Sequence, residues 1–476
     1  MGIQARPWWL ALPQNRVDVL VGNPPWLAFR YMTEPMQEAF RAYSDERGLW
    51  HGAKVATHQD LSGLFLVRAV ERYLRIGGRF AFVMPNAAVD RGQFRGLRTG
   101  RYKRADSQNS VSIAFDPAWD LRRIRPHFFP RGSAVLLGTR AAEPKPLPTD
   151  IVVWAGRVSE QNATWDAVKS FLVQSPGTAQ PASDDPTSPW AERFRNGATI
   201  FPRLIFFVTR QAAGPLGMPA GKAGVRSLQR NNDKKPWKLL PALEGVVETE
   251  FIRSVLLGES VIPFRMVRTF EAVLPRDREG LMDAQSDRLD AYEGLASWWR
   301  RAEALWEKNR SSDRLTLLER LDYQHTLEQQ FPIQPERIVY TSSGMHLVAA
   351  RLNDRRAVIE HSLYWATAAS TAEAQYLCAI LNSAIFTELV RPFMSYGKDE
   401  RHFDKHIWQV PVPLYDPSDD LHSRLSARGA ELEAAIGKLE LVPGRHFAAT
   451  RRDVRGFIAE SEAGRDVEAL VEELLS

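Results

Sequence analysis

The sequence predicts an α/β fold whose first part is half of a doubly wound parallel sheet, followed by a mixed α+β domain and a helical tail. Residues 17–22 and 79–84 are short apolar runs that end in turn residues, and a long amphipathic segment connects them. Strand, helical crossover and strand in this order are typical of a parallel α/β sheet. Apolar runs recur after residue 200, and apolar residues at helical spacing follow Pro417.

Glycine and proline residues divide the first part into elements. Residues 17–22 are followed by Asn-Pro-Pro and are predicted to be a buried strand. A helix is expected to begin after its N-cap Asp60 and to end at Gly77-Gly78, directly before the strand 79–84. One more helix and two more strands are expected nearby, at 33–47, 111–116 and 134–139.

The remainder of the chain is expected to contain three parts. Residues 141–199 are rich in proline and polar residues and are predicted to be an irregular connector, with an exposed loop at 175–186. Residues 200–415 are predicted to form the second domain, and residues 416–476 the helical tail. Within the second domain we expect a strand at 204–208, β-rich segments at 261–275, 337–352 and 357–367, a helical insertion at 289–325 and a helix at 371–389.

Length and charge set broad limits on function. The chain has 476 residues, which at roughly 100–200 residues per domain suggests two to four domains. It contains 62 Lys plus Arg and 57 Asp plus Glu, for a formal net charge of +5. This excess is mild and does not by itself establish nucleic-acid binding.

The cysteine and histidine content and the hydropathy of the chain argue against disulfide-rich, metal-binding, membrane-spanning and secreted proteins. Cys378 is the only cysteine, which excludes a disulfide framework and a multi-cysteine metal site. His402 and His406 are four residues apart but no third ligand follows, so no metal site is predicted. The apolar stretch 374–387 is shorter than the ~20 residues of a membrane span, and the N-terminal region is too broken for a signal peptide. A cytoplasmic protein without a membrane partner is expected.

The tetrapeptide Asn23-Pro24-Pro25-Trp26 is the most informative motif. It follows the first predicted strand directly, and ligands of α/β sheets gather at the carboxyl ends of strands. Because proline fixes φ, the two prolines stiffen the turn. The alternative interpretation is a rigid turn without a chemical role, since Asn and Pro both favour turns.

This tetrapeptide resembles the Asn-Pro-Pro-aromatic motif of amino-methyltransferases, which use S-adenosylmethionine to methylate exocyclic nitrogens. The resemblance implies that the Asn23 amide oxygen and the Pro24 carbonyl accept the two amine N–H groups and aim the nitrogen lone pair at the methyl group. Pro25 would hold that carbonyl in place, and Trp26 would stack on the planar substrate once it is rotated out of the duplex. No metal is required.

The order of segments around the motif is similar to that of gamma-type adenine-N6 DNA methyltransferases. The strand 17–22, the helix after Asp60 and the strand 79–84 occur in the family order, and residues 128–136 resemble the segment whose aromatic packs on the other face of the flipped adenine. That role falls to Phe129, for which an ordinary core position at the end of a loop is the alternative. Residues 1–140 would then be a partial methyltransferase catalytic domain.

Glutamine methyltransferases that act on release factors carry the same tetrapeptide, so the second domain must decide between base and protein amide. Those enzymes are short, whereas more than 300 residues follow the methylase-like part here. Segments of this second domain resemble the target-recognition (DNA-specificity) domain of type IIG, restriction–modification-like adenine methylases. They are 197–203, 248–265, 337–350, 376–383, 401–403 and 410–413.

The resemblance implies that the chain binds double-stranded DNA, and basic residues cluster in the segments expected to contact it. Such residues could neutralise phosphates that flank an extruded base, and the alternative is a solvated cationic loop. In the first part they are expected on a loop after the second strand, and in the second domain on a polar loop. The candidates are Arg95, Arg98, Arg101, Lys103 and Arg104, then Lys398, Arg401, His402 and Lys405.

One part of the family pattern is missing from the sequence. The family has a Gly-rich turn after its first strand for the S-adenosylmethionine cofactor, and no such turn precedes residue 17. The strand 17–22 would then present an unpaired apolar edge. The chain is therefore expected to be the carboxyl-terminal part of a split methylase, or a subunit completed by a second chain that carries the cofactor-binding half; cofactor-binding residues are not assigned.

Two functions remain open from the sequence. The first is a site-specific adenine-N6 DNA methyltransferase that transfers a methyl group to a flipped adenine and is incomplete alone. The second is a non-catalytic DNA-binding specificity module or subunit of a restriction–modification-like system. The chain contains no recognisable carboxylate–lysine cluster of a nuclease.

Overall fold

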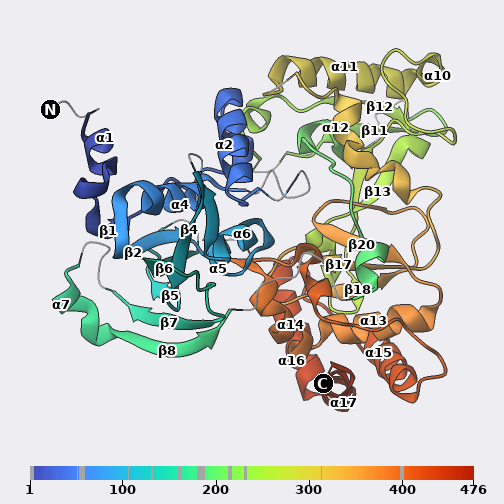
Figure 1. The fold of residues 1–476 in the computed structure, drawn as a ribbon. Helices are drawn as coiled ribbons and strands as arrows, with labels where there is room; N and C mark the ends of the chain where they lie inside the picture. Colours follow the sequence, from blue (N-terminus) through green and yellow to red (C-terminus); the bar gives the residue numbers. More distant parts are fainter. Residues whose placement is uncertain are drawn as a thin grey trace. The chain divides into compact units, whose positions relative to one another are not determined.

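A computed structural model shows a mixed α/β chain with several sheets and many helices (Figure 1). Two compact units are present: Met1–Asp185 with Ser395–Arg401 form unit 1, and Pro186–Met394 with His402–Ser476 form unit 2. The structure describes residues 5–50, 52, 59–104, 107–129, 132–158, 163–179, 188–212, 217–229, 233–311, 313–396 and 401–475.

Unit 1 is built on an eight-stranded sheet with the order β1-β2-β6-β5-β7-β8, and β4 pairs with both β3 and β6. Only the pairs β1–β2 and β5–β7 are parallel; the other pairs are antiparallel. The half of a parallel sheet that the sequence predicts is therefore a mixed sheet. The strands are β1 (Val17–Gly22), β2 (Leu74–Pro85), β3 (Arg101–Arg104), β4 (Ser107–Phe115), β5 (Trp119–Arg125), β6 (Ser133–Ala141), β7 (Asp150–Arg157) and β8 (Leu172–Thr178).

Helix α4 (Leu61–Tyr73) is the crossover between the two parallel strands β1 and β2 and contacts both. It begins as predicted, because the Asp60 carboxylate accepts a hydrogen bond from the Ser62 amide at 2.9 Å. It ends before Gly77-Gly78, which lie inside β2. Val17 pairs with Leu74 and Val19 with Arg79, so the two glycines occupy a bulge of β2, where Gly77 has φ +81°. The other helices of unit 1 are α1 (Ala5–Ala11), α2 (Glu34–Glu46), α5 (Ala87–Asp90), α6 (Arg95–Arg98) and α7 (Trp165–Val168).

Strand β1 is at the margin of the sheet (Figure 1). In the described part of the chain it pairs with β2 alone, so its second edge has no strand partner. Val19 and Val21 lie on one face of β1 and are 62% and 73% exposed, whereas Leu20 packs partly against the core. The prediction of a buried strand is therefore wrong for one face, because no described element covers it.

The predicted connector 141–199 is partly regular structure. Strands β7 and β8 lie inside it and extend the sheet, with β7 parallel to β5 and antiparallel to β8. Ile151 and Val153 of β7 are buried in the core of unit 1, which is why this proline-rich segment still forms strands. Strand β8 continues to Thr178 within the predicted loop, whose remainder from residue 180 lies outside the described residues.

Unit 2 contains a six-stranded sheet with the order β12-β11-β10-β16-β13-β19, a four-stranded sheet with the order β18-β17-β20-β9, and the pair β14–β15. The predicted strand 204–208 is instead a short helix followed by a strand. The strands are β9 (Arg195–Asn196), β10 (Phe207–Arg210), β11 (Lys222–Ser227), β12 (Glu244–Glu248), β13 (Ile252–Leu256), β14 (Val261–Ile262), β15 (Arg265–Met266), β16 (Phe270–Val273), β17 (Arg337–Thr341), β18 (Ala349–Leu352), β19 (Val358–Ile359) and β20 (Leu363–Thr367).

The predicted helical insertion is present, with α11 packed against β12. The predicted helix at 371–389 is divided in two at Ser383, whose hydroxyl caps the second helix by accepting from the Phe386 amide at 3.3 Å. Glu468 also accepts hydrogen bonds from two amides at this helix start, those of Ala384 at 2.7 Å and Ile385 at 3.0 Å. The helices are α8 (Trp190–Arg193), α9 (Arg203–Phe206), α10 (Asp287–Asp290), α11 (Glu293–Asn309), α12 (Leu317–Leu321), α13 (Thr371–Asn382) and α14 (Ala384–Val390).

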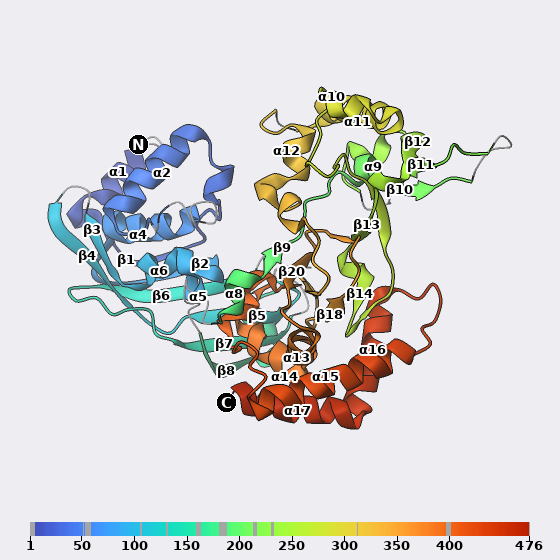
Figure 2. The same ribbon diagram turned by 90° about the vertical axis from the view of Figure 1, so that its right-hand side faces the viewer.

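Three helices lie where the helical tail is expected: α15 (Asp420–Lys438), α16 (Phe447–Glu460) and α17 (Glu462–Leu475). Figure 2 shows them together at one side of unit 2. Leu425, Val454 and Val467 share one hydrophobic core with Tyr340 of β17. The segment is thus an integral part of unit 2. No helix in the described ranges is long and apolar enough to span a membrane.

Candidate functional site

The Asn23–Trp26 turn lies directly after β1, at the carboxyl end of the parallel pair β1–β2. Gly22 precedes it and touches β2 so closely that a Cβ there would lie 2.7 Å from the Phe82 ring. Pro24 is buried, whereas Asn23 is exposed. The turn therefore has a fixed backbone and an Asn side chain that is open to a ligand.

Trp26 is held against the sheet and against a distant loop. Its indole N–H donates to the Val83 carbonyl of β2 at 3.3 Å. Its ring lies 5.1 Å from the Phe129 ring between centroids, with an angle of 43° between the ring planes. Phe129 comes from the loop between β5 and β6. The structure thus brings together the two residues that the sequence assigns to base stacking, although 103 positions separate them.

The spacing of these two rings limits what they can hold. A planar base between two rings needs roughly 7 Å from ring to ring, because each face requires about 3.5 Å of contact distance. At 5.1 Å the Trp26 and Phe129 rings contact each other instead. A base can therefore stack on both rings only after the loop that carries Phe129 moves outward.

Backbone hydrogen bonds fix the segment after the turn and the segment that follows the neighbouring strand β2. The Phe29 amide donates to the Gln59 carbonyl at 2.8 Å, and the Leu61 amide donates to the Leu27 carbonyl at 3.0 Å. These bonds tie the segment after Trp26 to the start of α4. Asn86 follows the neighbouring strand β2, and its amide donates to the Gly132 carbonyl at 2.8 Å.

A buried carboxylate, Asp90, lies four residues beyond Asn86 and was not singled out from the sequence. Burial raises the pKa of its carboxyl group, and the positive charges of three arginines oppose that rise. The arginines are Arg91, Arg122 and Arg98. The sequence offers one signal for this charge cluster. It is a single Asp that follows the end of a strand in an arginine-rich segment.

The predicted basic loop after the second strand is regular structure. Arg95 and Arg98 form the two ends of α6, and Arg101, Lys103 and Arg104 lie on β3, which pairs with β4. The reason is that Leu97 and Tyr102 are buried in the core of unit 1 and fix their neighbours in a helix and a strand. Arg101 and Lys103 are exposed, and the side chain of Arg104 lies outside the described residues.

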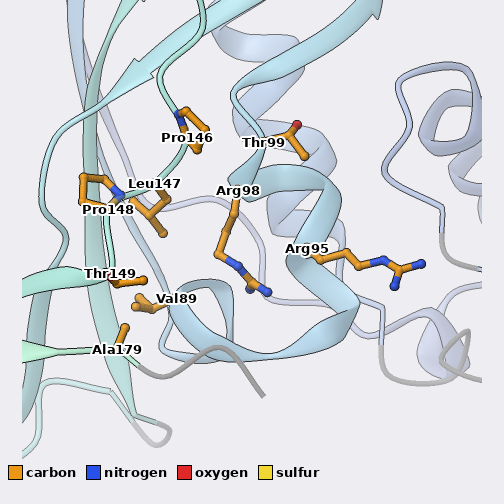
Figure 3. Close-up of a pocket in the computed structure, with 9 residues that line it drawn as sticks. All are labelled: Val89, Arg95, Arg98, Thr99, Pro146, Leu147, Pro148, Thr149 and Ala179. Atoms are coloured by element: carbon orange, nitrogen blue, oxygen red, sulfur yellow. The ribbon is translucent and has the colours of Figure 1, made fainter. Parts of the chain in front are cut away.

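Arg95 and Arg98 line a cavity of about 350 Å³, which has an apolar wall at residues 146–148 (Figure 3). The Arg98 guanidinium donates to the Arg91 carbonyl at 2.8 Å. Arg98 therefore stabilises the turn between α5 and α6. In Figure 3 the Arg95 side chain extends away from the apolar wall.

The predicted basic residues of the second domain are only partly described. Lys398 and the side chain of Arg401 lie outside the described residues. His402 is on the short strand β22 (Arg401–His402), which pairs with β21 (Ser395–Tyr396). Lys405 donates to the Ala191 carbonyl at 3.4 Å, and burial together with the Arg195 charge lowers its pKa.

The donor groups at this site do not fit a complete S-adenosylmethionine site. The turn after β1 contains two prolines, which lack the backbone N–H groups that a Gly-rich turn offers to a ligand. The neighbouring strand β2 is followed by Asn86 and α5, again without a Gly-rich turn. In the described residues we also find no group of three His, Cys, Asp or Glu side chains that could hold a metal ion.

Comparison with known proteins shows similarity to solved structures. No protein-family model matches this sequence, and no curated protein is similar to it. The solved structure of the type IIL restriction–modification enzyme MmeI in complex with DNA is similar over 98% of this chain, with a TM-score of 0.56 and 10% sequence identity. That likeness establishes the fold. The chain spans 55% of the length of MmeI.

Two further solved structures match more weakly. The type IIG restriction endonuclease BpuSI matches with a TM-score of 0.28 at 13% identity, over 98% of this chain and 55% of its own. The DrdV–DNA complex matches with a TM-score of 0.43 at 11% identity, over 93% of this chain and 46% of the DrdV chain. These TM-scores are too low to support a common fold.

Proposed function

We propose that this chain is the target-base and DNA-recognition part of an adenine-N6 DNA methyltransferase of a restriction–modification system. The observation that carries the proposal is the Asn23–Trp26 turn at the carboxyl end of β1 with Phe129 in contact with Trp26. The fold likeness to MmeI, whose structure contains DNA, supports it. Unit 2 would act as the target-recognition domain.

Asn23 and Pro24 would bind and orient the adenine amine. The exposed Asn23 side chain offers an amide oxygen, and Pro24 offers a backbone carbonyl, so each can accept one N–H of the amine. The two prolines fix the backbone before the base arrives, which lowers the entropic cost of orientation. Trp26, anchored on Val83, would stack on the flipped base and offset part of its unstacking cost.

The methyl donor would be S-adenosylmethionine, held by residues outside the described part of this chain. Because the parallel pair β1–β2 ends in an edge with an exposed apolar face, the position beside β1 is where a cofactor-binding segment would pair. Parallel strands normally have both faces covered. This segment would be supplied in trans or by a longer chain.

A DNA-binding specificity module without catalysis is the second candidate. The misfit between the proline turn and a complete cofactor site favours it. Such a module would bind duplex DNA and would leave no methyl groups that depend on Asn23. Duplex binding with a salt titration tests the property that both candidates share.

The deciding experiment changes Asn23 in the source organism, where any completing segment is present. We expect genomic N6-methyladenine at one sequence motif in the parent strain and its loss in an Asn23→Ala strain, because the amine loses one of its two acceptors. Asn353→Ala, a change at an exposed loop residue of unit 2, serves as the matched control. Protein abundance is measured by immunoblot.

The outcomes separate the candidates. Persistence of the methylation pattern in the Asn23→Ala strain would rule out the catalytic assignment. Absence of any motif-specific methylation in the parent, combined with duplex binding by the purified chain, would favour the specificity module.

A further inference from the structure

A second cavity, of about 540 Å³, lies in unit 2 and is lined by four arginines. They come from three segments that are distant in the sequence: Arg253 from the start of β13, Arg276 and Arg278 from the segment after β16, and Arg355 from the loop after β18. The cluster cannot be recognised as one run of positive charge in the sequence, because its arginines come together only in the folded chain.

The carboxylates around this cavity neutralise only part of the positive charge. Glu328 binds Arg276, with Nε to Oε1 at 2.9 Å. Asp277 lines the cavity but accepts hydrogen bonds from Arg288, at 2.9 and 3.1 Å. Among the lining residues, Glu250 is then the remaining carboxylate, and three arginines remain beside it: Arg253, Arg278 and Arg355.

Arg253 lies in a partly buried and positively charged environment. Burial and the nearby charges of Arg276 and Arg356 lower the pKa of its guanidinium, and Glu250 only partly opposes them. Its Nε atom is buried and has no hydrogen-bond partner among the described residues. A buried donor beside like charges is unfavourable unless an anion binds there.

The cavity wall is held in place by its own contacts. The Arg276 guanidinium lies 3.8 Å from the centroid of the Phe331 ring. The loop that carries Arg355 is anchored because the fully buried Arg337 donates to the Asp354 carbonyl at 2.6 Å. The Asp354 carboxylate also accepts from the Arg356 amide at 2.7 Å. The Arg276 side chain and the backbone of the loop that carries Arg355 are thus held in place by contacts within unit 2.

We propose that this cavity, named here the arginine pocket (Arg253, Arg276, Arg278 and Arg355), binds a phosphate group of the duplex DNA backbone. A guanidinium group matches a phosphate by two parallel hydrogen bonds. Contacts of this kind position a protein on the duplex without reading its sequence. The proposal rests on the proposed function, since DNA is the occupant, and it adds a specific backbone contact in unit 2.

The test uses the full chain and a fluorescein-labelled duplex of mixed sequence, with affinity measured by anisotropy at several salt concentrations. Arg355→Gln and Arg253→Gln are each expected to weaken binding by about 3- to 10-fold and to reduce the slope of log affinity against log salt by about 1. Arg452→Gln, at an exposed position of α16, removes the same charge outside the pocket and should change neither quantity.

Each outcome decides the matter. If Arg355→Gln and Arg253→Gln bind as Arg452→Gln does, or if the parent binds no duplex, the proposal is wrong. The alternative occupant is a free phosphate anion, which calorimetry with inorganic phosphate tests. If Arg253→Gln abolishes phosphate binding and leaves the DNA affinity unchanged, the pocket binds a free anion and the proposal is wrong. Arg355 is exposed, so its variant remains informative if Arg253→Gln fails to fold, which circular dichroism reports. The catalytic assignment is tested separately, by genomic methylation in the Asn23→Ala strain, so its failure would leave the anisotropy result standing.

Discussion

At the scale of single residues, the proposed base recognition rests on the contact between Trp26 and Phe129. The Val83 carbonyl fixes Trp26 on the sheet, whereas Phe129 is on a loop between two strands. The two rings touch at 5.1 Å between centroids, so a base that stacks on both must first replace that contact. In the proposed site, Trp26 would be the fixed half of the stacking pair and Phe129 the half that moves.

Replacement of Phe129 tests this division of roles. A base–aromatic stack contributes about 1–3 kcal/mol, so Phe129→Ala should lower the rate of methyl transfer by roughly 5- to 150-fold at subsaturating DNA. The measurement is the rate at which N6-methyladenine reappears at its genomic motif after the gene is induced. Phe128→Ala provides the control, since Phe128 is the adjacent, 36% exposed residue. Equal effects of the two variants would contradict a specific stacking role.

The site also shows how far residue-level prediction reached. The motif Asn23–Trp26 is contiguous, so its position after a strand could be predicted from local sequence. The proximity of Phe129 came from a family resemblance, and the coordinates agree with it. The arginine pocket and the cluster around Asp90 could not be predicted, because each depends on which strands become neighbours.

At the scale of elements, strand β1 determines what the sheet can bind. It is one end of the longest strand path and β8 is the other, and β3, which pairs with β4, is a third margin. β1 exposes Val19 and Val21 on one face. β8 exposes Val173 but also contains Pro176, which has no N–H to offer to a further strand, and β3 exposes the charged residues Arg101 and Lys103. We therefore expect a further strand to pair at the β1 margin.

A charge introduced on β1 or on β8 tests which of these two edge strands causes self-association. Without a completing segment, the exposed strand is expected to cause self-association, so Val21→Lys should reduce light scattering of the concentrated chain. Val173→Lys on β8, which replaces a residue that is 64% exposed, should leave the scattering unchanged. Equal scattering by the parent and Val21→Lys would show that β1 is not the adhesive edge.

Elements were predicted well where one local signal dominated and poorly where packing overrode it. The N-cap Asp60 placed the start of α4 correctly, but the glycine pair expected to end that helix forms a bulge in β2. A glycine pair satisfies either role, and the burial of Leu74 as a strand residue decided between them. In the same way, the prolines after residue 141 suggested a connector, whereas buried Ile151 and Val153 form a strand.

At the scale of the whole molecule, the chain has the fold of MmeI over 98% of its own residues and 55% of that enzyme's length. Unit 1 presents the proposed base-binding turn, and unit 2 carries the arginine pocket on a separate core. In our proposal, base orientation belongs to unit 1, and the arginine pocket adds a backbone contact from unit 2. Variants of the pocket should change affinity, and variants of the turn should change chemistry.

The purified chain should therefore bind duplex DNA while binding S-adenosylmethionine weakly. The turn after β1 offers two proline nitrogens without hydrogen, and in the described residues no strand covers the outer edge of β1. One wall of the expected cofactor crevice is thus missing from the described structure, and most of the binding free energy would go with it. We expect calorimetry to detect no binding of S-adenosylmethionine tighter than about 1 mM, equivalent to about 4 kcal/mol. A micromolar Kd for the chain alone would place the whole cofactor site within it, and the proposal that another segment completes the sheet beside β1 would then be wrong.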